Sequence, residues 1–165
     1  MQIGIIADTH DCLPLLHRAV ERFETENIDL VLHAGDFIAP FVIPALARLS
    51  CTLIGVFGNN DGDRALLQKK ADEFDNLEIR GDFAEIAIED RIFGLIHGSD
   101  TTLLHALIAG DRFDAIIHGH THQAAISTHG NTLVINPGEA CGYLTGSPTI
   151  GLLDTDTMEA CIVPI

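Results

Sequence analysis

The sequence has little positive charge. Nine Lys and Arg residues stand against 24 Asp and Glu residues in a chain of 165, which gives a formal net charge of −15 with neutral histidines. An acidic surface repels long polyanions, so broad binding to nucleic acid is not expected and a nuclease is a disfavoured alternative. The sequence also lacks the apolar run of about 18 residues that a membrane-spanning helix requires, so we expect no membrane partner.

Closely spaced cysteines are absent as well. Cys12, Cys51, Cys141 and Cys161 lie far apart and form no C-x-x-C pair, which excludes a zinc ribbon on spacing. No basic segment precedes the apolar residues 3–7, so we interpret the N-terminus as a first strand rather than a signal peptide. We therefore expect a cytoplasmic protein whose thiols are reduced.

The composition is that of a globular protein. Hydrophobic residues make up 47% of the chain, and neither a repeat nor a low-complexity linker interrupts it. A chain of this length can bury most of its surface around one core. We therefore expect a single domain over residues 1–165, and the sequence leaves homo-oligomerisation open.

The first half of the chain alternates predicted strands with predicted helices. Asp11 is the expected N-cap of the first helix. The strands are expected at residues 3–7, 30–32 and 52–57, and the helices at residues 13–26, 40–49 and 63–74. This order predicts parallel strands joined by right-handed crossovers, so their carboxyl ends meet at one edge of the sheet. Open α/β sheets bind their ligands at that edge.

The second half contains mainly short strands joined by turns. The expected strands span residues 77–79, 84–88, 91–95, 115–117, 124–127, 132–135, 149–153 and 158–163. One helix is predicted among them, at residues 101–109. Together the two halves indicate an α/β protein with two packed sheets and outer helices.

A histidine-rich segment, His118-Gly119-His120-Thr121-His122, follows the apolar residues 115–117. If the segment is extended, His120 and His122 point the same way, because side chains alternate along a strand. Gly119 permits a close approach of the backbone to whatever the histidines hold. Two converging imidazoles are typical of a metal site, although a polar loop with unrelated histidines is an alternative.

Other polar residues follow the ends of predicted strands. Together with the two histidines, the set is Asp8, His10, Asp36, Asn59, His97, His120 and His122. All seven offer oxygen or nitrogen and none offers sulfur, which suits divalent ions such as Mn, Fe, Zn, Ni or Mg. Seven ligands exceed one tetrahedral site but fit two metals that share a carboxylate, as in phosphatases and nucleases. The alternative interpretations are helix N-caps for Asp8, Asp36 and Asn59, and a core histidine for His97.

The chain resembles the calcineurin-like metallophosphoesterase superfamily, and specifically its small single-domain phosphodiesterase branch. The matching segments, in the family's order, are Asp8-Thr9-His10, Gly35-Asp36, Gly58-Asn59-Asn60-Asp61, His97-Gly98, Gly119-His120-Thr121-His122 and Asn136-Pro137-Gly138. Each motif is weak by itself, but several in order after strand-like runs are a strong signal. The resemblance implies a four-layer αββα sandwich of two mixed sheets flanked by helices.

The resemblance also implies a dinuclear metal centre. Asp8, His10 and His122 would hold one divalent ion, Asn59, His97 and His120 would hold the other, and Asp36 would bridge them. Manganese is the favoured ion, with Ni, Zn, Fe, Co or Mg as alternatives. A bridging hydroxide would attack a small phosphodiester or phosphomonoester, and the implied catalytic residues are Asp36, Asn59, Asp61 and His97.

Two reservations accompany the resemblance. Many superfamily members have a histidine at the position of Asn60 that is thought to assist the leaving group, and an amide cannot donate a proton as a general acid. Asp61 is expected to support the site or cap a helix rather than to bind metal. A non-catalytic alternative is a protein-binding scaffold resembling the retromer scaffold subunit, which shares the fold but has lost metal-ligand histidines.

Overall fold

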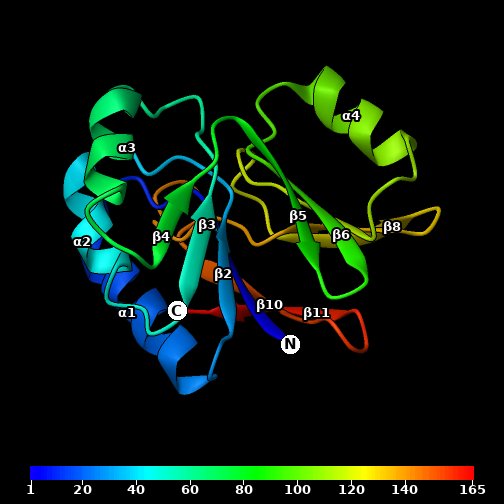
Figure 1. The fold of residues 1–165 in the computed structure, drawn as a ribbon, viewed down its shortest axis with the longest axis horizontal. Coiled ribbons are helices and arrows are strands. Elements are labelled where there is room, and N and C mark those ends of the chain that lie inside the picture. Colours follow the sequence, from blue (N-terminus) through cyan, green and yellow to red (C-terminus); the bar gives the residue numbers. More distant parts are fainter.

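The computed structural model describes residues 1–165, which form two β-sheets packed face to face with helices on both outer sides (Figure 1). The first sheet contains β1 (Gln2–Ile6), β2 (Leu30–His33), β3 (Thr52–Gly55), β4 (Leu77–Ile79), β10 (Thr149–Asp154) and β11 (Glu159–Pro164). Its strand order is β11-β10-β1-β2-β3-β4. Strands β1 to β4 are parallel, as the alternating pattern predicted, whereas β10 and β11 form an antiparallel hairpin beside β1.

The second sheet is also mixed. It contains β5 (Phe83–Ile88), β6 (Arg91–Ile96), β7 (Ala115–Ile117), β8 (Ala125–His129) and β9 (Thr132–Asn136), in the order β5-β6-β7-β9-β8. The central strands β6, β7 and β9 are parallel, and the two hairpins at the edges are antiparallel. The carboxyl ends of the parallel strands therefore form an edge in this sheet as well.

The helices are distributed over both outer faces. Helices α1 (Leu13–Thr25), α2 (Ile43–Leu46) and α3 (Arg64–Ala71), with the 3-10 turn η1 (Pro40–Val42), cover the first sheet, and α4 (Thr101–Ala109) lies on the second (Figure 1). A cluster of 20 buried apolar residues lies under α1 to α3, 17 more fill the space between the sheets, and four lie under α4. These three apolar layers confirm the four-layer αββα fold. No helix is long and apolar enough to span a membrane.

Several local predictions need correction. The N-cap of α1 is Cys12, without a side-chain hydrogen bond, because the carboxylate of Asp11 instead accepts a hydrogen bond from the backbone N–H of Ala39 at 2.9 Å. The helix predicted over residues 40–49 consists of a 3-10 turn and one short α-helix. The helix predicted over residues 63–74 is shorter, since Asp63 caps α3 and the helix ends at Ala71.

The histidine-rich segment is not extended, contrary to the prediction. The chain leaves the sheet after β7, and His120 and His122 have φ angles of 70° and 60°, in the left-handed region. The Thr121 N–H donates to the Gly119 carbonyl at 2.9 Å, which closes a tight turn centred on His120. His120 and His122 therefore do not point the same way by strand alternation.

Candidate metal centre

The predicted ligands come from five loops at one end of the sandwich. Each of these loops follows a strand of one of the two sheets. Asp8 and His10 lie after β1, Asp36 after β2, Asn59 after β3, His97 after β6, and His120 and His122 after β7. Parallel strands place their carboxyl ends at a common edge, and the two packed sheets bring their edges together. The fold thus assembles side chains that are separated by more than 100 positions in the chain.

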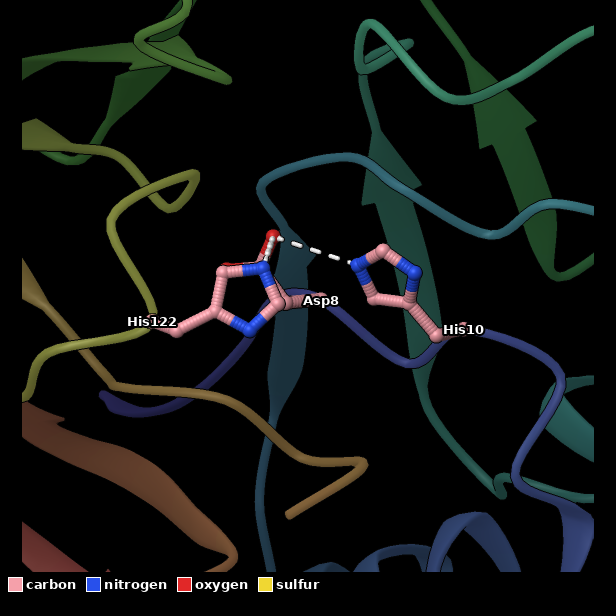
Figure 2. A group of neighbouring side chains, drawn as sticks. All are labelled: Asp8, His10 and His122. Atoms are coloured by element: carbon pink, nitrogen blue, oxygen red, sulfur yellow. Dashed lines mark ion pairs between the residues drawn. The ribbon is translucent and has the colours of Figure 1, made fainter. Parts of the chain in front are cut away.

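Asp8, His10 and His122 form one group (Figure 2). The Oδ1 atom of Asp8 lies 3.9 Å from Nε2 of His10 and 3.6 Å from Nε2 of His122. The two imidazole rings tilt toward each other with their centroids 5.1 Å apart. Three ligand atoms of suitable chemistry therefore face a common point.

Asn59, His97 and His120 form a second group beside the first. Nε2 of His97 lies 2.9 Å from the amide oxygen of Asn59, and the rings of His97 and His120 meet edge to face at 5.1 Å. Nδ1 of His97 lies 2.8 Å from the carbonyl oxygen of Ala34, which can only accept, so Nδ1 carries the hydrogen. Nε2 is then the nitrogen that is turned toward the centre.

Asp36 lies between the two groups. Its Oδ2 atom is 3.3 Å from Nε2 of His10 and 3.4 Å from Nε2 of His97. Asn60 fixes this carboxylate, since its backbone N–H donates to Oδ1 at 2.9 Å and its side-chain amide donates to Oδ2 at 2.7 Å. One carboxylate therefore faces histidines of both groups.

The side chains present fit a bound cation. Asp8 Oδ1 and His10 Nε2 are buried polar atoms without a hydrogen-bond partner, and the contact of His10 with Asp36 lacks hydrogen-bond geometry. Such atoms are rare in folded proteins, where buried polar groups are almost always paired. A carboxylate oxygen and an imidazole nitrogen that face each other are suitable donors for a divalent ion.

The backbone supports a functional interpretation of the same loops. Five of the seven predicted ligands have positive φ angles between 41° and 70°: Asp8, His10, Asp36, His120 and His122. Non-glycine residues rarely adopt this region, and such strain persists mainly where the surrounding structure requires it, often at active sites. The fold thus holds these side chains in positions that a relaxed loop would not favour.

The helix-cap interpretation of Asp8, Asp36 and Asn59 is wrong. The N-caps of the four α-helices are Cys12, Val42, Asp63 and Asp100, so none of Asp8, Asp36 and Asn59 caps a helix. The core-histidine alternative for His97 is not contradicted, because the ring is 2% exposed and its nitrogens lie 2.8 Å from the Ala34 carbonyl oxygen and 2.9 Å from the Asn59 amide oxygen.

Asp61 has a supporting position. Its two oxygens accept backbone N–H groups from Asp36 at 3.2 Å, Ile38 at 2.7 Å and Gly58 at 2.7 Å. It is not a helix cap, and its oxygens are directed at backbone rather than at the two groups. Its inclusion in the catalytic set remains a prediction.

The two central carboxylates differ in acidity. Burial raises the pKa of Asp8 to about 6, against the opposing influence of His97 and His122. Burial also acts to raise the pKa of Asp36, but His10, His97 and Asn60 outweigh it and hold that pKa well below its usual value. Asp36 is therefore the permanent negative charge of the centre, and a cation at Asp8 must displace any proton there.

The sequence analysis missed Glu139. This residue is fully buried, and its Oε2 lies 2.7 Å from Nδ1 of His122. The sequence held one signal that could have pointed to Glu139: it comes directly after Asn136-Pro137-Gly138, which begins at the last residue of β9. The side-chain amide of Asn136 donates hydrogen bonds to the Gly119 carbonyl and to Thr121 Oγ1, each at 3.0 Å. These bonds fix the turn that is centred on His120.

The largest cavity adjoins the centre without containing a predicted ligand. It has a volume of about 690 Å³ and lies between α4 and strands β8 and β9. Gly98, His118 and Thr121 line it, and Gly98 and Thr121 are bonded directly to predicted ligands. The size is typical of pockets that hold small organic molecules.

The chain is similar to proteins of a known family. The model of the calcineurin-like phosphoesterase superfamily domain matches residues 1–158. Phosphodiesterase MJ0936 of Methanocaldococcus jannaschii is 43% identical over 159 residues, which cover 96% of this chain and 96% of that protein. A solved archaeal phosphodiesterase has a TM-score of 0.95 and 42% identity, with 100% of both chains covered.

A more distant likeness concerns the fold alone. Wild-type Vps29 of Entamoeba histolytica, solved in complex with zinc, has a TM-score of 0.71 at 24% identity. The match covers 99% of this chain and 91% of that one. At this identity the similarity concerns the fold, and nothing about activity follows from it.

Proposed function

The chain belongs to the calcineurin-like phosphoesterase superfamily, and from that membership we propose that it hydrolyses small phosphodiesters at a centre of two divalent metal ions. Members of this family are hydrolases of phosphoric ester bonds that use divalent metals. The two-metal centre, the ligand assignment and the substrate class are our proposal for this chain. Manganese remains the favoured ion.

The observation that carries the proposal is the position of Asp36. One of its oxygens faces Nε2 of His10 at 3.3 Å and Nε2 of His97 at 3.4 Å, so it can serve both groups of predicted ligands. In the proposed assignment Asp8, His10 and His122 hold one ion, Asn59, His97 and His120 hold the other, and Asp36 bridges them. Two bound ions would supply an activated water and positive charge for in-line attack at phosphorus.

The residues of the chain would orient rather than react. The Ala34 carbonyl fixes the ring of His97, and the Asn60 amide fixes the carboxylate of Asp36. Asn60 is therefore occupied by a bridging ligand and cannot supply a proton to the leaving group.

Metal-dependent turnover tests this function. We expect hydrolysis of a nitrophenyl phosphodiester by protein supplied with Mn²⁺, and loss of that activity when a chelator removes the metal. The substrate panel should include a nitrophenyl monoester and a single-stranded oligonucleotide, assayed against Mn²⁺, Ni²⁺, Zn²⁺, Fe²⁺, Co²⁺ and Mg²⁺. Absence of turnover with every ion would favour the scaffold alternative, and a preference for the oligonucleotide would favour a nuclease.

The structure gives the scaffold alternative no specific support. All seven ligand positions of the family pattern are filled, and five of these residues bring ligand atoms within 4.8 Å of one another in two overlapping groups, Asp8 with His10 and His122 and Asp8 with Asp36 and His97. The relative with 43% identity is named a phosphodiesterase, whereas the likeness to Vps29 concerns the fold alone. The cytoplasmic location, the single domain over residues 1–165 and the oligomeric state remain predictions.

A further inference from the structure

Glu139 is a buried carboxylate that accepts hydrogen bonds from several directions. It follows the Asn136-Pro137-Gly138 segment and has no exposed surface. Its Oε2 contacts Nδ1 of His122 at 2.7 Å. Its other contacts are the Leu144 N–H at 3.0 and 3.1 Å, the N–H and hydroxyl of Thr145, and the thiol of Cys141 at 3.3 Å.

These contacts determine which nitrogen of His122 carries the hydrogen. The backbone N–H groups can only donate, and the Thr145 hydroxyl lies 2.7 Å from Glu139 but 3.4 Å from the Ser147 carbonyl, so its one hydrogen points to Glu139. A carboxylate surrounded by donors has no proton to give, so Nδ1 of His122 must be the donor in their contact. Nε2 of His122 is then left with its lone pair, and it faces Asp8 Oδ1 at 3.6 Å.

The same carboxylate holds the loop of residues 142–147. Tyr143 and Leu144 on this loop are 63% and 75% exposed, so burial of their side chains does little to order it. The loop backbone is held instead by its hydrogen bonds to Glu139. Burying an ionised carboxylate without hydrogen-bond donors costs free energy. The loop and the His122 ring supply these donors, and together they stabilise the ionised form of Glu139.

We propose that Glu139 is a positioning residue that holds His122 in its Nδ1–H tautomer, fixes the orientation of the ring and couples this ring to the order of the 142–147 loop. The part concerning cation affinity rests on the proposed metal centre, whereas the tautomer and the loop belong to the metal-free protein. Carboxylates that orient a metal-binding histidine typically change metal affinity by about 10- to 100-fold when mutated.

The test compares Glu139→Gln with Glu159→Gln, an exposed position on β11. Glutamine keeps the size of the side chain but replaces one acceptor oxygen with a donor group. In the metal-free variant we expect ¹⁵N NMR to show a mixed His122 tautomer, and hydrogen exchange to accelerate at the amides of Leu144 and Thr145. Titration with Mn²⁺ should show one ion bound about 10- to 100-fold more weakly and the other unchanged. The Glu159→Gln variant should match the native protein.

Glu139→Asp provides a second variant that retains the negative charge with a shorter reach, and it should restore part of the lost affinity. An unchanged tautomer and unchanged loop exchange in a folded Glu139→Gln variant would overturn the proposal. Equally weaker binding of both Mn²⁺ ions, with faster amide hydrogen exchange throughout the protein, would also overturn the proposal, since that pattern indicates a general structural role. Failure of the native protein to hydrolyse any ester would refute the proposed function and leave these readouts valid.

Discussion

At the scale of single residues, Asp36 and Asn59 differ in what they contact although each follows a parallel strand. The carboxylate of Asp36 faces His10 and His97 and accepts two hydrogen bonds from Asn60. The neutral amide of Asn59 contacts only the ring of His97. A change at Asp36 should therefore disturb both halves of the centre, and a change at Asn59 should disturb one.

We expect Asp36→Ala to reduce kcat/KM more than Asn59→Ala does. Loss of a single electrostatic stabiliser costs about 10²–10³-fold, and Asp36→Ala should reach or exceed this range. Activity and bound manganese should be measured together on both purified variants. Small and equal effects of the two substitutions would show that the centre is misplaced.

The next prediction concerns Asn60 and the dependence of the hydrolysis rate on the leaving group of the ester. Its amide donates to Asp36 at 2.7 Å, and a positioned general acid would contribute about 10²–10⁴-fold. We expect nitrophenyl esters to be hydrolysed far faster than alkyl esters, and Asn60→His to narrow that difference. The measurement is kcat/KM against the pKa of the leaving group for both proteins. A shallow dependence in the native protein would mean that another group already donates the proton.

His33 is a buried histidine whose ring contacts Phe37, Gly35 and Thr9 rather than the predicted ligands. Its ring is buried and stacks on Phe37 with centroids 3.7 Å apart. Nδ1 accepts the Gly35 N–H at 3.1 Å, and Nε2 lies 3.2 Å from the Thr9 hydroxyl. Burial lowers the pKa of His33 to about 3, with a further contribution from the charge of His97.

The low pKa of His33 predicts a dependence of stability on pH. The unfolded chain binds this proton below about pH 6.5, whereas the folded protein resists it down to about pH 3. Stability should therefore fall as the pH falls through this range, by at most about 1.4 kcal/mol per pH unit for this group. Denaturant unfolding with a chelator present should show a shallower fall for His33→Gln than for the native protein. Parallel curves would contradict the assignment.

At the scale of elements, the loops after β1 and β7 approach each other so closely that a glycine is required between them. A Cβ atom at Gly119 would lie 2.7 Å from the Cβ of Ala7 and 2.8 Å from Oδ2 of Asp8. The His120 N–H donates to that same Oδ2 at 3.0 Å. Gly119 thus joins the two sheets at the position where Asp8 and His122 meet.

We expect Gly119→Ala to destabilise the protein by about 1–3 kcal/mol, as overpacking usually does, and to weaken metal binding. Gly62→Ala is a matched control, because a Cβ atom there meets nothing within 4 Å. Denaturant unfolding and manganese titration should be carried out on both variants. If Gly119→Ala behaves like Gly62→Ala, the close approach of the two loops is not important for the centre.

At the scale of the whole molecule, the chain carries a formal net charge of −15, and we expect bound cations to stabilise its folded state. Asp8 and Asp36 are fully buried carboxylates in the same site, and their repulsion destabilises the folded state unless cations offset it. Metal binding should therefore contribute to stability as well as to activity.

We expect about two manganese ions per chain after reconstitution, as a two-metal centre requires. Metal at 100 times its dissociation constant should stabilise the folded protein by about 2.7 kcal/mol per ion, which a chelator should reverse. Elemental analysis and thermal unfolding with and without chelator measure both effects. No bound metal under saturating conditions would refute the centre, and a single ion would remove Asp36 as a bridge.

The sequence by itself determined the types and order of the elements and the candidate ligands. Strand periodicity and loop polarity are local properties, and α4 over residues 101–109 was predicted with its observed bounds. The prediction of one helix over residues 40–49 was wrong, because the chain there forms the 3-10 turn η1 and the short helix α2. The local sequence pattern does not encode how these two short elements pack on the first sheet.

Only the tertiary structure decided how the candidate ligands contact one another and which residues support them. A tight turn centred on His120 precedes His122, and Glu139 contacts His122 from the segment that follows β9. The position of Asp36 between His10 and His97 likewise depends on the packing of two sheets. A sequence pattern records spacing along the chain, whereas these contacts depend on distances between segments that meet only after the sheets have packed.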